Sequence, residues 1–354
     1  MVEKKPMYLK KSLSVFIVLV LLFPALAVCG QDFNAVILMY HKFGEDRYPS
    51  TSVTLAQFDS HLDYLKNNGF HVLPLEEVVS AFRSQSPLPD KSIAVTVDDA
   101  YLSVYKEAYP RMKKLNWPFT VFVASDGVDK GFSSYMNWDQ MREMQKNGVL
   151  FANHTSTHDY LIRKKEGETT DVHVARIRAD IERCQKRLTE ELGSAPMLFA
   201  YPYGEYNTDI AQLVESMGFA AFGQHSGAMG LHGNPVTLPR FPVNQHYGDV
   251  KNLRAKFHSL ALPVLSIDPF EPVTADRQPV LEVNLENTDA RLNELACFIS
   301  GQGRTDPTWI ESDKRFSIQA AKPLSKGRNR YTCTAPNQAR NRYYWFSHQF
   351  VIRP

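Results

Sequence analysis

Short apolar runs alternate with helix-like segments between residues 35 and 225, and this alternation constrains the fold more than any other feature of the chain. Strands separated by helices pair in parallel, and this many units favour a distorted (β/α) barrel of about seven strands, which is an α/β fold. The strand-like runs are Ala35–Tyr40, Ser92–Val97, Phe119–Ala124, Val149–Asn153, Met197–Tyr201 and Phe219–Gly223. The helical segments between them cover residues 54–69, 101–115, 137–148, 171–192 and 208–217.

The pattern changes near residue 264, where the helical segments stop. The later part of the chain contains strand-like runs between Gly, Pro and Asn turns, among them Val280–Leu285, Phe316–Ala320 and Tyr343–Ile352. Several short strands with turn signals between them indicate a small all-β sandwich. We therefore predict a barrel domain over residues 32–263 and a β-sandwich accessory domain over residues 264–354.

The N-terminus has the pattern of an export signal. Four lysines precede an apolar run, Leu13–Phe23, and small residues lead to a cleavage site after Ala27, so we predict a signal peptide over residues 1–27. A permanent membrane helix is the alternative, but the run is shorter than the roughly 20 residues that a span needs. Residues 26–29 also resemble a bacterial lipoprotein box, although Val28 stands where a small residue is expected. We predict an exported protein, periplasmic or secreted, with lipid anchoring at Cys29 (signal to residue 28) as the less favoured alternative.

The charge balance gives no sign of a polyanionic partner. The whole chain has a net charge of +2, and residues 1–27 contribute a surplus of three positive charges, so the remainder carries −1. Proteins that bind nucleic acid present an excess of Lys and Arg, so we expect no nucleic-acid partner.

The cysteines are consistent with export. Cys297 and Cys333 each lie in a strand-like run of the C-terminal region, where an oxidising compartment would allow them to form a disulfide. The alternative is that both are reduced and packed in a core. Cys184 lies in a helical segment and is expected to be a lone buried thiol.

Polar residues directly follow most strands of the predicted barrel. The carboxyl ends of parallel barrel strands lie at one rim, where barrel enzymes build their active sites. We therefore expect these side chains to converge at that rim. They are His41, Asp98, Asp99, His154, His158, Tyr203 and His225.

Three of these residues form a metal-ligand set. Asp99 offers a hard anionic oxygen, and His154 and His158 offer imidazole nitrogens, which together leave open coordination positions, as catalytic zinc sites do. The adjacent carboxylates of Asp98 and Asp99 repel each other unless a cation or a proton offsets the repulsion. Alone, the Asp pair is more typical of a helix cap, and a His pair four residues apart is more often solvated. Their convergence at one rim favours the metal site.

At these positions the sequence resembles the polysaccharide deacetylases, the NodB-type domain of family 4 carbohydrate esterases. Thr96–Asp99 (TVDD) is similar to the family's first motif, His154–His158 (HTSTH) to its second and Tyr201–Gly204 (YPYG) to its third. Leu38–His41 (LMYH) resembles the opening segment of members with circularly permuted motif order. The resemblance covers roughly residues 33–260.

The resemblance implies a role for each residue. One divalent metal ion would be held by the Asp and two His named above; zinc is expected, although cobalt, nickel or manganese also suit these ligands. Asp98 would be the general base, and the backbone N–H of Tyr203 would bind the oxyanion. His41 would be the general acid, with His225 as its competitor; alternatively, His41 only hydrogen-bonds a loop.

The sequence departs from the family pattern at the first and third motifs. Ala100 replaces the glycine that often follows the Asp pair, which restricts the turn there. The arginine that usually opens the third motif and orients the base is missing, since Phe199 and Ala200 precede Tyr201. Arg240 is the nearest candidate for that role, and the alternative is a surface residue at a strand end.

The resemblance implies a metal-dependent hydrolase that removes N-acetyl groups from an N-acetylglucosamine-containing polysaccharide and releases acetate. Peptidoglycan, poly-N-acetylglucosamine and chitin-like oligomers are all compatible substrates. Two other functions stay open: a carbohydrate-binding protein on an inactive barrel, and a metal-dependent amidase that acts on a non-carbohydrate amide.

Overall fold

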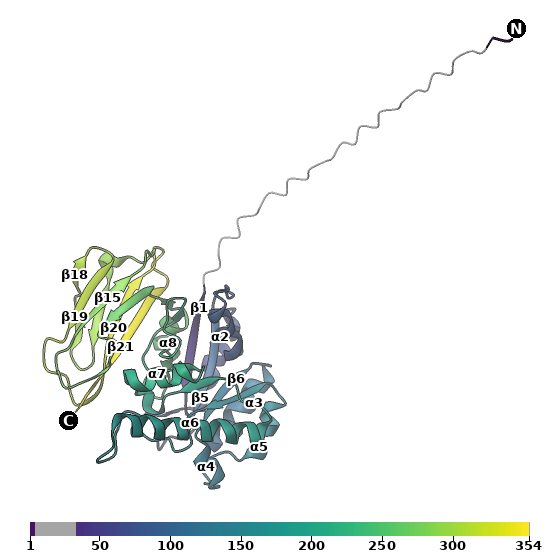
Figure 1. Cartoon of the computed structure of the whole chain (residues 1–354), viewed down its shortest axis with the longest axis vertical. Coiled ribbons are helices and arrows are strands. Elements are labelled where there is room, and N and C mark those ends of the chain that lie inside the picture. Colours follow the sequence, from purple (N-terminus) through teal and green to yellow (C-terminus); the bar gives the residue numbers. More distant parts are fainter. Residues whose placement is uncertain (4–32, 354) are drawn as a thin grey trace. The chain divides into compact units, whose positions relative to one another are not determined.

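The computed structural model describes residues 1–3 and 33–353 (Figure 1). Apart from residues 1–3, the predicted signal peptide lies outside the described residues, and so does Cys29. In the part of the chain that the structure describes, no helix is long and apolar enough to cross a membrane.

The central sheet confirms the predicted α/β architecture: it is a curled, barrel-like sheet with seven strands in its main path (Figure 1). Its strand order is β10-β1-β5-β6-β7-β8-β9, and all neighbours are parallel except β10 and β1. The strands are β1 (Asn34–Tyr40), β5 (Ser92–Asp98), β6 (Phe119–Val123), β7 (Val149–Asn153), β8 (Leu198–Ala200), β9 (Ala220–Phe222) and β10 (Met229–Gly230). Short strands β2 (Lys42–Phe43) and β3 (Ser52–Val53) pair with each other, and β4 (His71–Val72) pairs with β5.

Helices connect the strands, as the alternation predicts. Thr54 and Asn137 each form a capping box at a helix start, which satisfies backbone N–H groups that would otherwise lack partners. The predicted helices are α1 (Leu55–Asn67), α3 (Tyr109–Lys114) with a π-helical turn over Val104–Ala108, α5 (Trp138–Gln145), α6 (Thr170–Leu192) and α7 (Thr208–Ser216). Three further helices were not predicted: α2 (Leu75–Arg83), α4 (Ser125–Asp129) and α8 (Val250–Phe257).

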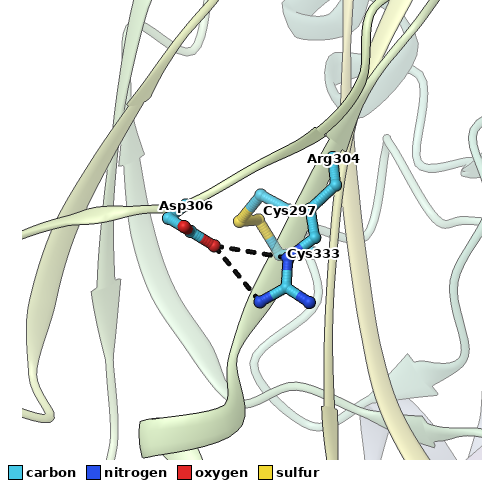
Figure 2. Close-up of a disulfide and its surroundings, with 4 residues drawn as sticks. All are labelled: Cys297, Arg304, Asp306 and Cys333. Atoms are coloured by element: carbon cyan, nitrogen blue, oxygen red, sulfur yellow. Dashed lines mark hydrogen bonds and ion pairs between the residues drawn. A yellow bond between two sulfur atoms is a disulfide. The ribbon is translucent and has the colours of Figure 1, made fainter.

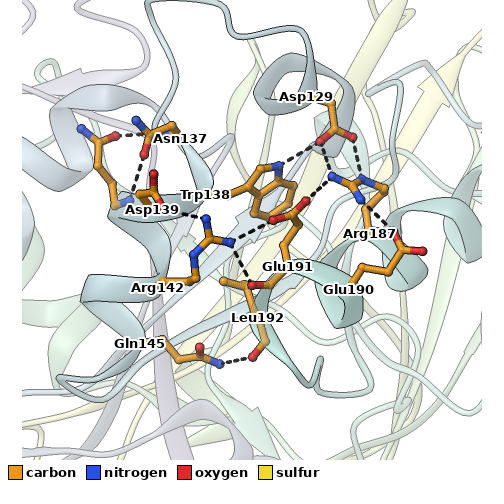
Figure 3. A network of polar contacts seen from close by, with 11 residues as sticks. Asp129, Asn137, Trp138, Asp139, Arg142, Gln145, Arg187, Glu190, Glu191 and Leu192 are labelled. Carbon is orange, nitrogen blue, oxygen red and sulfur yellow. Dashed lines mark hydrogen bonds and ion pairs between the residues drawn. The ribbon is translucent and has the colours of Figure 1, made fainter.

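The contact between α5 and α6 combines an apolar layer with a polar surface network (Figure 3). Met141 and Met144 of α5 are fully buried in the same core cluster as Leu188 of α6. On the surface, Arg142 bonds to Glu191, while Arg187 bonds to Asp129, Glu190 and Glu191. Exposed ion pairs contribute little, typically about 0–1 kcal/mol each, so the buried methionines and leucine do most to hold the two helices together.

An irregular segment stands between the first and last strands of the parallel sheet. Leu238 forms a parallel bridge with Phe222 at the end of β9, and three residues later β11 (Phe241–Pro242) pairs with β1. The N–H of Val243 then donates to the carbonyl of Met39. Residues 238–243 thus fill the gap between β9 and β1, and this segment carries Arg240.

The C-terminal part consists of two sheets in which most strand pairs are antiparallel, which confirms its all-β character. One sheet has the order β12-β21-β20-β16-β17 with β14 beside β21, and the other has the order β13-β15-β19-β18. The first contains β12 (Leu260–Ala261), β14 (Val273–Thr274), β16 (Ala296–Ile299), β17 (Gly303–Thr305), β20 (Gly327–Pro336) and β21 (Tyr343–Ile352). The second contains β13 (Val264–Asp268), β15 (Val280–Leu285), β18 (Thr308–Glu311) and β19 (Arg315–Gln319).

A disulfide between Cys297 and Cys333 joins neighbouring strands of the first sheet (Figure 2). The two cysteines are register partners on β16 and β20, and both are fully buried, so the predicted pairing is confirmed. Cys184 is a buried free thiol, as predicted. The domain boundary at residue 264 stays a prediction; β12, just before it, already pairs with β21.

Candidate active site

Four predicted site residues meet at the carboxyl ends of β5 and β7. Asp98 is the last residue of β5 and Asp99 follows it, while His154 directly follows β7 and His158 lies four residues further on. Both strands pair in parallel with β6, which lies between them, so their carboxyl ends lie at the same edge of the sheet. The rim predicted from the sequence therefore exists for these four side chains.

Asp99, His154 and His158 form a compact set of potential metal ligands. One oxygen of Asp99 lies 3.5 Å from Nε2 of His154 and 3.1 Å from Nε2 of His158. The three ligand atoms all lie within 4.8 Å of one another. Zinc–nitrogen and zinc–oxygen bonds of about 2.0–2.2 Å in tetrahedral geometry place ligand atoms roughly 3.4 Å apart. The residues therefore fit a small divalent cation.

The surroundings of His154 also suit a metal ligand. Its Nδ1 lies 2.7 Å from the carbonyl oxygen of Ala200, so Nδ1 carries the proton and Nε2 keeps its lone pair toward Asp99. Burial lowers the pKa of His154 to about 4, which leaves the imidazole neutral at neutral pH. Burial by itself raises the pKa of Asp99, but the neighbouring histidines outweigh it and hold the pKa well below its usual range. A neutral imidazole and an ionised carboxylate are the forms that bind metal.

Left-handed backbone conformations concentrate in the three motif segments. Asp99, Ala100, Thr155, His158 and Tyr203 all have φ between 52° and 75°. Residues other than glycine rarely adopt this region, and such conformations cluster at functional sites where the surrounding structure holds them. Ala100 adopts this region with φ of 52°, a conformation that glycine adopts more readily.

Asp98 forms a fully buried ion pair with Arg240. Two guanidinium nitrogens of Arg240 donate to the two carboxylate oxygens over 2.7 and 2.8 Å, and both side chains have no exposed surface. Arg240 also donates to the hydroxyl of Thr96 and to the carbonyl of Gly223. Burial raises the pKa of Asp98, but the Arg240 guanidinium and nearby His154 more than offset it, so the net pKa is lowered. The alternative of a surface arginine at a strand end does not hold.

His41 lies at the same rim, whereas His225 does not join it. Nε2 of His41 is 3.9 Å from a carboxylate oxygen of Asp98. His225 is buried and lines a separate cavity of about 720 Å³ together with Trp345 and His348. The N–H of Arg240 donates to the carbonyl of His225.

Tyr203 belongs to an aromatic group beside the histidines. Its ring lies 4.7 Å from that of His158, edge on, and is stacked on Tyr160 at 3.8 Å. The guanidinium of Arg163 lies 3.5 Å from the centre of the Tyr160 ring. Tyr160 and Arg163 were not predicted as site residues, and the only signal in the sequence was an aromatic residue two positions after His158. This group forms one wall beside the candidate metal site.

Comparison with known proteins shows which family part of this chain resembles. Residues 85–222 match the family model described as "Polysaccharide deacetylase". The chain is 28% identical over 200 residues to the poly-beta-1,6-N-acetyl-D-glucosamine N-deacetylase of Staphylococcus aureus (strain MRSA252), which covers 54% of this chain and 68% of that protein.

Solved structures of deacetylases have a similar fold. The chain is similar to IcaB from Ammonifex degensii, with 27% identity and a TM-score of 0.56 over 65% of this chain and 99% of that one. The Streptococcus pyogenes deacetylase PplD, solved in complex with acetate, shows the same fold at 24% identity, with a TM-score of 0.57 over 64% of this chain and 99% of that one. Residues 85–222 therefore match the polysaccharide deacetylase family model, and the barrel with its Asp/His/His rim has the NodB-type fold of solved deacetylases.

Proposed function

We propose that the protein is a metal-dependent N-deacetylase that hydrolyses acetamido groups of an N-acetylglucosamine polymer to acetate and free amine. The observation that carries this proposal is the juxtaposition of the Asp99–His154–His158 set with the buried Asp98–Arg240 pair. The first set is chemically suited to a divalent cation, and the second holds a carboxylate in one orientation beside it. The poly-beta-1,6-N-acetyl-D-glucosamine substrate of the Staphylococcus aureus relative makes that polymer the first substrate to test.

Asp99, His154 and His158 would hold the ion. When bound there, a divalent cation supplies Lewis-acid chemistry: it acidifies water and polarises a carbonyl group. We favour zinc, with cobalt, nickel or manganese as alternatives, because two imidazoles and one carboxylate suit all four.

Asp98 would accept the proton of the attacking water. Arg240 donates one hydrogen bond to each carboxylate oxygen of Asp98, and each of these oxygens has a second lone pair that can accept the proton. The bidentate contact fixes the plane of the carboxylate, so Arg240 would act through Asp98, as a positioning residue.

Tyr203 and His41 would stabilise the negatively charged oxygen and protonate the leaving amine, respectively. Water adds to the acetyl carbon, and the N–H of Tyr203 would hydrogen-bond the oxygen that becomes negative. The C–N bond then breaks and the departing nitrogen needs a proton, which His41 would supply. Its 3.9 Å distance from Asp98 supports this assignment over His225, which lines the separate cavity.

We further propose that the protein is exported. The basic and apolar pattern of residues 1–27 supports this proposal, as does the buried Cys297–Cys333 disulfide, because disulfides persist in oxidising compartments. Mass spectrometry of the N-terminus of the mature protein would test cleavage after Ala27 against lipid attachment at Cys29.

Acetate release is the test of the proposed activity. Purified protein, stripped of metal and reloaded with zinc, cobalt, nickel or manganese, is incubated with poly-beta-1,6-N-acetylglucosamine, chitin oligomers and peptidoglycan. We expect acetate from at least one polymer only after metal is restored. Binding of a polymer without acetate release would favour the carbohydrate-binding alternative, and release only from non-carbohydrate amides would favour the amidase.

A further inference from the structure

The turn that carries Tyr203 has an unusual backbone. Tyr203 and Gly204 are both left-handed, with φ of 59° and 68°. A Cβ on Gly204 would lie 2.5 Å from the Cβ of Gln224, so only glycine fits where this turn meets the residues after β9. A tyrosine in this conformation needs contacts from its surroundings to stay there.

Two strands of the C-terminal sheet supply such contacts. Arg328 on β20 donates from Nη1 to the carbonyl of Tyr203 and, over 3.1 Å, to the side-chain oxygen of Gln224. Its Nε lies 3.6 Å from a carboxylate oxygen of Glu205. Gln349 on the neighbouring strand β21 is buried and donates to the carbonyl of Gly204 over 2.6 Å.

These contacts fix two successive peptide units of the turn. The carbonyls of Tyr203 and Gly204 are each held by a side chain from outside the barrel. On its other side the turn bears the Tyr203 ring, which contacts His158. Movement of the turn would therefore shift both the Tyr203 N–H and the ring that packs against a candidate metal ligand.

We propose that Arg328 and Gln349 are positioning residues for the reaction: the C-terminal β-region holds the Tyr203 turn in the conformation that binds the oxyanion. This inference rests on the proposed deacetylase function and goes beyond it, because it gives the β-region a part in turnover instead of in polymer binding. It predicts that these residues affect kcat, while a polymer-binding role would affect KM.

The test compares Arg328→Met, Arg328→Lys and Gln349→Leu with the wild-type protein. Loss of one oxyanion donor costs about 10²–10³-fold in kcat, so displacement of the turn should lower kcat by about 10-fold or more. We expect unchanged metal content and a KM within about twofold for both a short N-acetylglucosamine oligomer and the polymer. Arg328→Lys should retain more activity than Arg328→Met, since lysine can still donate to the Tyr203 carbonyl.

Arg304→Met is the matched control. Arg304 lies on β17 of the same region and pairs with Asp306, close to the disulfide (Figure 2). Because it does not touch the turn, its replacement should leave kcat unchanged. Normal kcat in Arg328→Met and Gln349→Leu, or a raised KM for the polymer alone, would overturn the inference.

Hydrogen–deuterium exchange supplies a readout that does not depend on activity. Arg328→Met should speed exchange in the peptide that covers residues 201–205 and leave the peptide around His154 unchanged, whereas Arg304→Met should change neither. Unchanged exchange in the turn would refute the inference even in an active enzyme. Faster exchange in a protein that releases no acetate would instead locate the failure in the proposed function.

Discussion

Replacement of Arg240 by methionine should destabilise the protein strongly. Arg240 and Asp98 are both without exposed surface, and methionine would leave the Asp98 carboxylate buried without its main partner. Breaking a buried ion pair by removal of one partner typically costs about 3–5 kcal/mol, because the remaining charge is not compensated. We expect a loss of free energy of unfolding of that size in Arg240→Met.

Arg187→Met provides a matched control. Arg187 makes four hydrogen bonds, as many as Arg240, but in the surface network of Figure 3 and with partly exposed partners. Exposed ion pairs contribute about 0–1 kcal/mol each, so this variant should lose much less stability than Arg240→Met. Urea titration followed by both fluorescence and circular dichroism measures both variants.

A double-mutant cycle separates the ion pair from simple loss of packing. Arg240→Met combined with Asp98→Asn removes the uncompensated charge, so the double variant should be more stable than the sum of the single losses by about 2 kcal/mol or more. Additive losses, or a loss below about 1 kcal/mol in Arg240→Met, would show that the pair does not hold the site as described.

Three further predictions concern histidines. His154→Ala should abolish stoichiometric metal binding measured by plasma mass spectrometry, while His71→Ala, which replaces an exposed histidine on β4, should keep it; equal metal content would refute the ligand assignment. His41→Ala should lower kcat by about 10²–10⁴-fold with metal retained, and His225→Ala should not; the reverse result would pass the acid role to His225. Burial lowers the pKa of His225 to about 4 and that of His348 to about 3, so below pH 6.5 the unfolded chain binds more protons than the folded protein. The free energy of unfolding should therefore fall as the pH drops from 6.5 toward 4. Urea titrations at several pH values should show a flatter pH dependence for a variant with both histidines replaced by glutamine.

The strand–helix alternation predicted the barrel because its strands are buried on both faces and its helices are amphipathic. Val149–Asn153 and Val280–Leu285 were predicted with the bounds that the structure has. Helix α2 was not predicted, although Val78, Val79 and Phe82 bury one face; it is nine residues long, and Pro74 at its start provides no side-chain cap. Helix α8 was missed because only Leu253 and Phe257 are buried in it.

The site was more predictable than the closure of the barrel. Asp99 and His154 come directly after β5 and β7, and His158 lies four residues further on, so parallel pairing brings the three to one rim. The position of Arg240 depends on an irregular segment between β9 and β1, which no periodicity indicates. The contacts of Arg328 with the Tyr203 turn join residues 125 positions apart, and nothing local in the sequence marks them.

Acetate release by the zinc-loaded wild-type protein and by Asp98→Asn tests the central claim most directly. The asparagine side chain cannot accept a proton from water, whereas the metal ligands are left in place. We predict that the wild type releases acetate from poly-beta-1,6-N-acetylglucosamine, and that Asp98→Asn binds an equal amount of zinc and is about 10²–10⁴-fold slower. Turnover near the wild-type rate in a fully metal-loaded Asp98→Asn variant would contradict the account.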